Sequence, residues 1–471
     1  MHIKKTLALL ALVLGSSALQ AETIRVAIGT QDTTINCATG GLLIRELKLL
    51  EKYLPKDGKY KDAKYEIVWK NFTSGPPLTN EMVADKLDIG SMADFPGALN
   101  AAAFKKAGKK SVFITALSGS PQGSGNGLVV PIDSPVTSLA GLKGKSISVP
   151  FGSTAHSMLL RALKAQGLDP DKEVNLVSQS PEVGGSALQS HKIDAHADFV
   201  PFAELFPYRG FARKIYDGAQ ANAPTFHGTL VNTDYAKKYP EVVVAFLRAA
   251  IEADRLISAE PEKYSELIAK TTGIEAEVNY LFHGPLGLQT RDFTFKPEYR
   301  AALKTAIDTL ALLKRNDVPL TADELIDDSY LRAAFKLSGL DYDKQLKTYG
   351  RQPLVAKDAQ TGAAIKDFNR VTQVWVEGEP KVRNYVSPES ALFAVRDAEK
   401  AGKKVRVVLV HDRVSGLKLL ANLAWFVRNP NGQIDAYLEK DAADKAAQKA
   451  GGSVVNFAST FAATAITAAA R

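Results

Sequence analysis

Apolar residues follow two different patterns along the first part of this chain. Short runs rich in β-branched and aromatic side chains predict strands, and segments with apolar residues every three to four positions predict helices. The two kinds alternate from Glu22 to about Asp198. Such alternation is typical of an α/β fold with a mostly parallel sheet covered by helices. We predict strands at 24–28, 65–72, near Ile89 and at 111–117, and helices at 42–54, 79–87 and 98–108.

The segments that follow indicate two crossings between lobes. Residues 121–131 (PQGSGNGLVVP) are rich in glycine and lead into a second αβ unit, and Leu230–Asn232 is predicted as the strand that returns. Two lobes joined by two crossings are typical of binding proteins that close about a hinge. The predicted division is 22–120 with 229–348 for lobe I, 121–228 for lobe II, 349–366 for a linker and 367–471 for a small α+β domain.

The segment 143–167 joins a strand to a helix through a glycine turn. A β-type run at 146–149 precedes the turn, Ser153 or Thr154 is a suitable N-cap for the helix, and Gly167 is a suitable stop. Such a turn points free backbone N–H groups, two hydroxyls and the positive end of a helix dipole at one place, so it can bind a small anion. An ordinary capped helix is the alternative interpretation.

Polar loops follow the ends of the predicted strands. In open α/β sheets, ligands bind outside the carboxyl ends of the strands. The loops at these ends are Gln31–Asn36, Asn71–Gly75, Ser91–Phe95 and Gly152–His156. We therefore expect these four loops to converge on one cleft.

Residues 1–21 have the organisation of a secretory signal peptide. Lys4 and Lys5 precede an apolar run, and small residues lead to a predicted cleavage after Ala21. The run is too short to span a bilayer, and no later stretch is long enough. With Cys37 as its single cysteine, the chain has no intramolecular disulfide. We predict a protein exported to the periplasm.

Charge adds little to this picture. Loss of Lys4 and Lys5 lowers the formal net charge from +8 to +6, which only weakly favours acidic small solutes. No basic run or basic–aromatic stripe is dense enough to predict nucleic-acid binding. The length is sufficient for two to three domains.

Four blocks carry a resemblance to a known family. They are KLDIGSMAD (86–94), LKGKSISVPFGSTAH (142–156) with its LLRAL helix, IDAHADFVPF (193–202) and YPEVVVAFLRA (239–249). They resemble periplasmic solute-binding proteins of ABC importers, in the nitrate, alkanesulfonate and taurine group, over about residues 22–340. The resemblance implies a two-lobed periplasmic binding protein fold of type II. It also implies a monomer without catalytic residues or cofactors that delivers its solute to an ABC permease in the inner membrane.

The resemblance also implies the solute and its site. The expected solute is a small organosulfur oxyanion (an alkanesulfonate, a taurine-like sulfonate or a sulfate ester), with nitrate or another small oxyanion as the alternative. Hydroxyls and His156 would donate to its oxygens, and Phe95 would pack on an organic tail. The loop carboxylates either hold loops or pair with the amine of a zwitterion. The expected ligand-binding residues are Gln31, Asp32, Thr33, Asn36, Thr73, Asp94, Phe95, Gly152, Ser153, Thr154, His156 and Asp198.

Other activities have weaker support in the sequence. The segment 191–198 (HKIDAHAD) holds two histidines five residues apart, which is not the spacing of a helical zinc pair, so we predict no metal site. A Ser-His-Asp hydrolase would need the GxSxG turn, which is missing. A thiamine-precursor binding protein or an enzyme on the same fold stays open, with Cys37 as the only hint of a nucleophile.

Residues 367–471 predict a compact α+β unit. Short strands surround helices at 389–402 and 441–452, and the segment 407–427 faintly resembles the NosL-type accessory domain, which handles copper in that family. Soft copper ligands are Cys and Met, yet every Met and the only Cys precede residue 160. We therefore expect copper binding to have been lost, and a docking or stabilising domain is the alternative.

Overall fold

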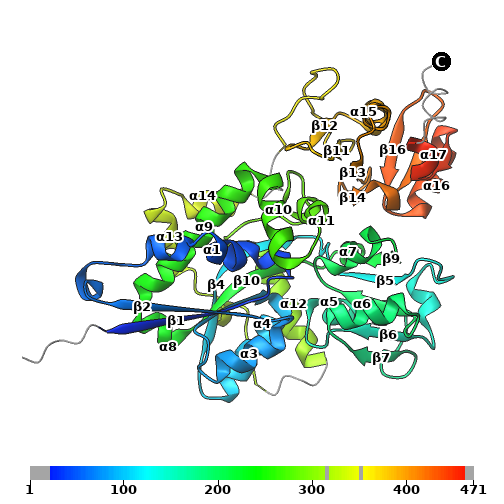
Figure 1. Ribbon diagram of the computed structural model, residues 1–471. Helices are drawn as coiled ribbons and strands as arrows, with labels where there is room; N and C mark the ends of the chain where they lie inside the picture. The colour runs from blue at the N-terminus through cyan, green and yellow to red at the C-terminus, as the bar shows by residue number, and fades with distance from the viewer. Residues whose placement is uncertain (1–21, 313–317, 349–353, 462–471) are drawn as a thin grey trace, which may run out of the picture.

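The computed structural model describes residues 22–312, 318–348 and 354–461, and the predicted signal peptide lies outside these ranges. Figure 1 shows a large lobe that contains the N-terminal strand, a smaller lobe beside it, and a C-terminal unit. Within the described ranges, no helix is both long and apolar enough to cross a bilayer. The two lobes and the extra sheet unit confirm the predicted fold class.

The first lobe is built on a five-stranded sheet with the order β2-β1-β3-β10-β4. β1 pairs in parallel with β2 and β3, whereas β10 runs antiparallel between β3 and β4. Every residue of β3, β4 and β10 is buried, as expected for strands covered on both faces. The strands are β1 (Thr23–Thr30), β2 (Lys64–Asn71), β3 (Ile89–Ala93), β4 (Ser111–Ser120) and β10 (Thr225–Asn232).

Amphipathic helices surround this sheet. In the longest of them, α9, Val242, Phe246 and Ala250 recur every four positions and are completely buried. The helices of this lobe are α1 (Leu42–Glu46), α2 (Leu49–Tyr53), α3 (Gly75–Val83), α4 (Asp94–Lys106), α8 (Thr233–Lys238), α9 (Pro240–Ala259), α10 (Pro261–Thr272), α11 (Ala276–His283), α12 (Pro297–Leu312), α13 (Ser329–Leu337) and α14 (Tyr342–Lys347).

Two predicted elements of this lobe were wrong in detail. The helix predicted at 42–54 is divided into α1 and α2, because Lys48 adopts a left-handed conformation with φ of 52°. The loop predicted at Ser91–Phe95 is absent, since β3 continues to Ala93 and α4 begins at Asp94. Asp94 therefore lies in the first turn of a helix, where the helix dipole favours a negative charge.

The second lobe has its own five-stranded sheet, with the order β7-β6-β8-β5-β9. β6 pairs in parallel with β7 and β8, and β5 runs antiparallel to β8 and β9. The strands are β5 (Gly127–Pro131), β6 (Ser146–Val149), β7 (Asn175–Ser178), β8 (Ala195–Asp198) and β9 (Ala212–Asp217). The helices are α5 (Thr154–Ala165), α6 (Pro181–Gln189) and α7 (Phe202–Tyr208).

Two crossings connect the lobes. The chain leaves the first sheet after β4 at Ser120 and enters the second sheet at Gly127. It leaves the second sheet after Asp217 through a short 3-10 helix, η4 (Gly218–Ala221). β10 belongs to the first sheet from Thr225 onward, four residues before the position at which the sequence pattern placed the change of lobe.

The C-terminal unit repeats one arrangement twice. In each half, two antiparallel strands are followed by a helix and a third strand, which pairs with the first strand of that half. The predicted helices and most predicted strands are confirmed, whereas β14 and β15 were missed. The elements are β11 (Thr372–Val376), β12 (Arg383–Tyr385), α15 (Pro388–Lys400), β13 (Val405–His411), β14 (Lys418–Leu420), β15 (Trp425–Arg428), β16 (Ile434–Tyr437), α16 (Lys440–Ala450), β17 (Ser453–Val455) and α17 (Phe457–Phe461).

Candidate functional site

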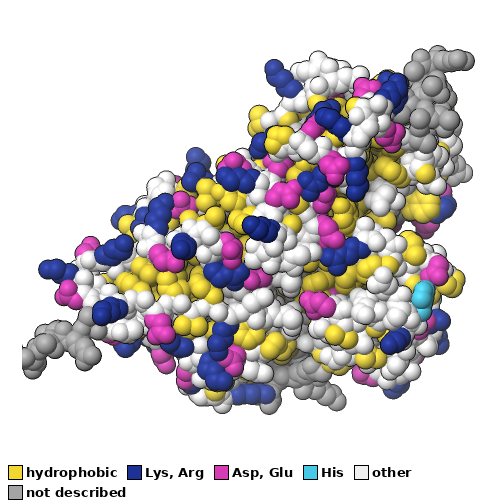
Figure 2. All heavy atoms as spheres, viewed as in Figure 1, with side chains coloured by type: hydrophobic (Ala, Val, Ile, Leu, Met, Phe, Trp, Pro, Cys, Tyr) yellow, Lys and Arg dark blue, Asp and Glu magenta, His cyan; other side chains and the backbone are white. Residues whose placement is uncertain are grey.

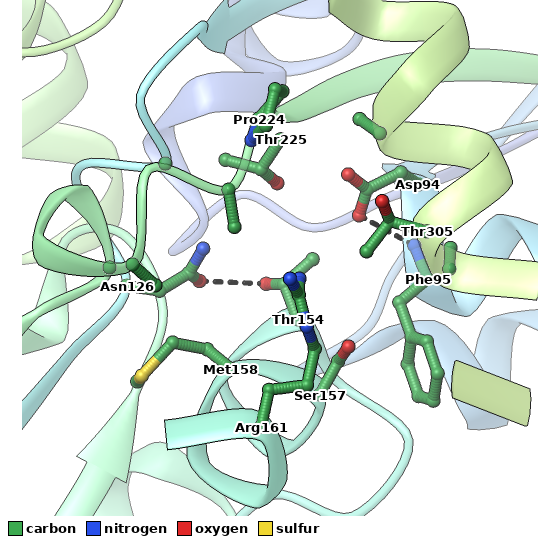
Figure 3. Close-up of a pocket in the computed structure, with 16 residues that line it drawn as sticks. Asp94, Phe95, Asn126, Thr154, Ser157, Met158, Arg161, Pro224, Thr225 and Thr305 are labelled. Carbon is green, nitrogen blue, oxygen red and sulfur yellow. Dashed lines mark hydrogen bonds between the residues drawn. The ribbon is translucent and has the colours of Figure 1, made fainter. Parts of the chain in front are cut away.

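A pocket that is partly open to solvent lies between the two lobes. The first lobe contributes the start of α4 and one face of α12, and the second lobe contributes the first turns of α5. Both crossings complete the wall (Figure 3). Its polar lining side chains are Asp94, Asn126, Thr154, Ser157, Arg161, Thr225 and Thr305.

One face of α5 supplies the second lobe's share of this pocket. Thr154, Ser157, Met158 and Arg161 occupy positions i, i+3, i+4 and i+7, so they project from the same side of the helix. On the other side of the helix lie the buried apolar residues Ala155, Leu159, Ala162 and Leu163. The glycine turn before α5 therefore presents the pocket-lining face of the helix to the first lobe.

Arg161 is the cation of the pocket. Its side chain is half-buried, and it makes no hydrogen bond or ion pair with any residue that the structure describes. In Figure 3 its guanidinium reaches toward Thr154 and the centre of the pocket. A guanidinium carries a fixed positive charge and five N–H donors, so a pocket that contains one without a carboxylate partner is suited to an anion.

Asp94 brings a carboxyl group to the opposite wall. It accepts hydrogen bonds from the backbone N–H groups of Phe95 (2.6 Å) and Phe226 (3.3 Å). Burial raises the pKa of Asp94 to about 7, although these hydrogen bonds and the charge of Arg161 act in the other direction. Near neutral pH this carboxyl group is therefore divided between its neutral and its ionised form.

Direct contacts between the lobes show that the cleft is closed around the pocket. The Ser157 hydroxyl lies 3.5 Å from the hydroxyl of Thr309 on α12. Gly152 adopts a φ of 82°, and a Cβ atom at this position would lie 3.0 Å from Pro76 and 3.3 Å from Leu99, both in the first lobe. Glycine thus allows the backbone of the turn to approach the first lobe.

The structure places three of the residues expected to bind the ligand in the pocket: Asp94, Phe95 and Thr154. The Thr154 hydroxyl donates to Asn126 (2.8 Å). Ser153 lies one residue before the helix, and its hydroxyl caps α5 by accepting the N–H of His156 (3.2 Å).

The other expected residues of the second lobe are not among the residues that line the pocket. The His156 ring stacks on Phe151 with centroids 4.5 Å apart and accepts the N–H of Gly152. Asp198 is completely buried, where it pairs with His196 at 2.8 Å and accepts the N–H of Phe199. Burial raises the pKa of Asp198, and the neighbouring imidazole opposes that shift.

The loop after β1 is held inside the first lobe. Gln31 donates to the carbonyl of Ser91, Asp32 forms an ion pair with Arg45 (2.9 Å), and the Asn36 amide contacts the ring of His227 (3.2 Å). Thr33 is partly buried and Thr73 is exposed, and neither lines the pocket.

Sequence reasoning missed five polar residues of the pocket. Arg161 and Ser157 could have been found, because they share the helical face of Thr154 at spacings of seven and three. Asn126, Thr225 and Thr305 had no such signal, since the first crossing, β10 and α12 are distant from α5 in the sequence.

Two arrangements that suggest enzymes are buried. Ser148, His196 and Asp198 form a continuous row, with the Ser148 hydroxyl 2.6 Å from one ring nitrogen and Asp198 2.8 Å from the other, yet all three are completely enclosed. Cys37 is also buried, and burial raises its thiol pKa, which opposes a reactive thiolate. Among the described residues, no group of three His, Cys, Asp or Glu side chains could hold a metal ion.

Comparisons of sequence and of structure both find periplasmic binding proteins similar to this chain. The sequence profile of a family described as NMT1/THI5 like matches residues 54–264. The chain is 31% identical over 280 residues to the taurine-binding periplasmic protein of Escherichia coli, covering 56% of this chain and 82% of that protein. It also resembles the crystal structure of the periplasmic aliphatic sulphonate binding protein SsuA from Escherichia coli (27% identity, TM-score 0.52, 67% of this chain and 100% of the other).

The same fold also occurs in an enzyme. The desulfurization enzyme DSZB has a TM-score of 0.50 to this chain at 16% identity, with 67% of this chain and 99% of that chain covered. At that identity the likeness concerns the fold alone.

Proposed function

We propose that this chain is the substrate-binding component of an ABC importer and captures a small sulfur oxyanion. The chain belongs to the NMT1/THI5-like family together with the periplasmic taurine-binding protein. The observation that carries the proposal is Arg161, a guanidinium that has no hydrogen-bond or ion-pair partner among the described residues and lies in a pocket between the two lobes. Family membership supports the binding role, and the pocket supports the anionic ligand.

A sulfonate or sulfate group matches the chemistry of this wall. Its tetrahedral oxygens accept several hydrogen bonds at once, which a forked guanidinium and adjacent hydroxyls can donate. Ser157 and Thr305 are placed on opposite walls of the pocket, and Met158 and Phe95 offer apolar surface for a short carbon tail. Because hydrogen bonds to a charged group are stronger than neutral ones, Arg161 should supply most of the polar binding energy.

The pocket contains one positive and one negative side chain, which favours a ligand with both charges. Arg161 and Asp94 are the charged residues among its described lining. An ionised Asp94 would bind the ammonium group of a taurine-like sulfonate, and a neutral Asp94 would tolerate a plain alkanesulfonate. We therefore place taurine-like sulfonates first within the proposed class, and alkanesulfonates and sulfate esters next.

The partner and location follow from the same proposal. An inner-membrane ABC permease would receive the solute in the periplasm, and the protein would act as a monomer without cofactor, metal or turnover of its ligand. On the face shown in Figure 2, basic and acidic side chains are interspersed, an arrangement that gives nucleic acid no continuous basic surface.

The test is calorimetry on Arg161→Ala with taurine, ethanesulfonate, a sulfate ester and nitrate. Loss of hydrogen bonds to a charged group should weaken sulfonate binding by about ten- to 150-fold. Lys164→Ala is the matched control, because it removes the same charge from an exposed position on the same helix. Equal affinities in the two variants would show that Arg161 does not bind the sulfonate. If thiamine precursors alone raised the melting temperature, the proposed ligand class would be wrong.

A further inference from the structure

The short helix η4 lines the pocket with one side and contacts the C-terminal unit with the other. Gly218 and Ala221 face the pocket. The Gln220 side chain accepts the backbone N–H of Asp217 (2.8 Å) and donates to the carboxylate of Glu439 (3.0 Å), at the start of α16. The amide oxygen of Gln220 is thus hydrogen-bonded within its own turn, and its amide nitrogen is hydrogen-bonded to the C-terminal unit.

The C-terminal unit is anchored more firmly on α10 and α11. Arg406 of β13 pairs with Glu277 (2.5 Å) and Glu266 (2.6 Å), and the Lys418 ammonium donates to the carbonyl of Pro285 (2.9 Å). Glu277 and Lys418 are buried, so their contacts are shielded from solvent, whereas the Arg406–Glu266 pair lies at the surface. Figure 1 shows this unit beside α10 and α11, with α7 and β9 of the second lobe nearby.

The second lobe meets the same two helices. Arg209, directly after α7, pairs with Glu275 at 2.8 Å. Burial and the nearby carboxylate of Glu277 raise the pKa of Tyr208. The buried Glu277 side chain, which pairs with Arg406 of the C-terminal unit, thus also lies near Tyr208 of the second lobe.

We infer that the C-terminal unit braces the closed cleft: it is anchored on α10 and α11 of the first lobe and, through Glu439, holds the pocket-lining turn that leads out of the second lobe. A ligand enclosed by both lobes binds with an affinity reduced by the fraction of molecules that are closed. Contacts present in the closed arrangement raise that fraction and therefore the affinity. This inference rests on the proposed solute-binding function and adds a regulator to it.

The test uses the full chain with Glu439→Ala and Gln220→Ala, singly and together. Each single variant should weaken the binding of taurine or ethanesulfonate by about twofold to fivefold, the range measured for exposed charged contacts. The double variant should bind no more weakly than Gln220→Ala alone, because that change already removes the contact with Glu439 together with the hydrogen bond to Asp217. Asp441→Ala is the control, since it removes an exposed carboxylate from the first turn of the same helix and should leave the affinity unchanged.

A second measurement is independent of any ligand. Amide hydrogen exchange of residues 217–222 should be faster in Glu439→Ala than in the unaltered chain or in Asp441→Ala, because the turn has lost its outer support. Unchanged exchange would overturn the brace, whether or not sulfonates bind. If exchange accelerates while no sulfonate binds even the unaltered chain, the brace stands and the proposed ligand class fails. Additive losses in the two single variants would also overturn the inference.

Discussion

The charge state of Asp94 should make the affinities for two kinds of sulfonate change with pH in opposite directions. Ethanesulfonate carries only a negative charge, so it should bind best when Asp94 is neutral. Taurine carries an ammonium group in addition, so it should bind best when Asp94 is ionised. Because burial raises the pKa of Asp94 to about 7, the change of preference falls within a range that is accessible in solution.

The size of the effect follows from that pKa. With a pKa of about 7, roughly a tenth of the Asp94 carboxyl groups are ionised at pH 6 and about nine tenths at pH 8. An affinity scales with the fraction of the binding-competent form, so ethanesulfonate should bind about tenfold more tightly at pH 6 than at pH 8, and taurine about tenfold less tightly.

Calorimetry at several pH values, with both ligands and with Asp94→Asn, measures this directly. Asparagine resembles the neutral carboxyl group and can still accept the N–H of Phe95, although the longer contact with Phe226 is lost. The variant should keep ethanesulfonate binding, lose most taurine binding and show flat pH profiles. Asp62→Asn, an exposed carboxylate of the same lobe, should keep both slopes. Parallel slopes for the two ligands in the unaltered chain would refute the assignment of Asp94.

The same pKa shift also predicts a trend in stability. The folded chain retains a proton on Asp94 between pH 3.8 and about 7, whereas the unfolded chain releases it. This group therefore stabilises the fold at low pH, and its contribution is lost as the pH rises through the folded pKa. Urea unfolding of Asp94→Asn should lack that part of the pH dependence.

Two further predictions concern the turn before α5. Gly152→Ala should weaken ligand binding by at least severalfold, because the added Cβ meets Pro76 and Leu99 when the cleft closes. The control is Gly167→Ala, which has a similar positive φ with open space around it and should change only the free energy of unfolding. Equal affinities of the two variants in calorimetry would exclude the closure contact. Ser153→Ala should lower the free energy of unfolding by about 1 kcal/mol through loss of the helix cap, and an unchanged urea midpoint would show that the cap contributes nothing.

Local pattern was enough to predict most elements of the fold. The strand β6 and the helix α5 were found from four consecutive β-type residues, a glycine turn and helical spacing, because each signal lies within a few residues. The helix predicted at 42–54 failed because Lys48 adopts a left-handed conformation that a lysine rarely takes, so its identity gives no signal that the helix breaks there. The short strands β14 and β15 offered too few residues for a period to be recognised.

The pocket was less accessible to sequence reasoning, because it is assembled from distant segments. Loops at strand ends were expected to converge, yet the loop after β1 is held within its own lobe by Gln31 and Asp32. Thr305 on α12 reaches the pocket from a helix that no local pattern connects with α5. Arg161 could have been predicted as a ligand-binding residue, since it belongs to the LLRAL segment that carries the family resemblance. The sequence alone, however, does not show that this face of α5 lies against the first lobe.

The position of β10 determines the order in which the lobes can be completed as the chain folds. β10 separates β3 from β4, and Thr229 contacts Ser91 across 138 positions of sequence. The second lobe is encoded continuously between the two crossings, so it can fold as soon as that stretch is available. The sheet of the first lobe lacks β10 between β3 and β4 until the chain returns from the second lobe, and closing so long a loop is slow. The lobe that begins first is therefore finished last, and damage to β10 would leave the second lobe folded beside an unfinished partner.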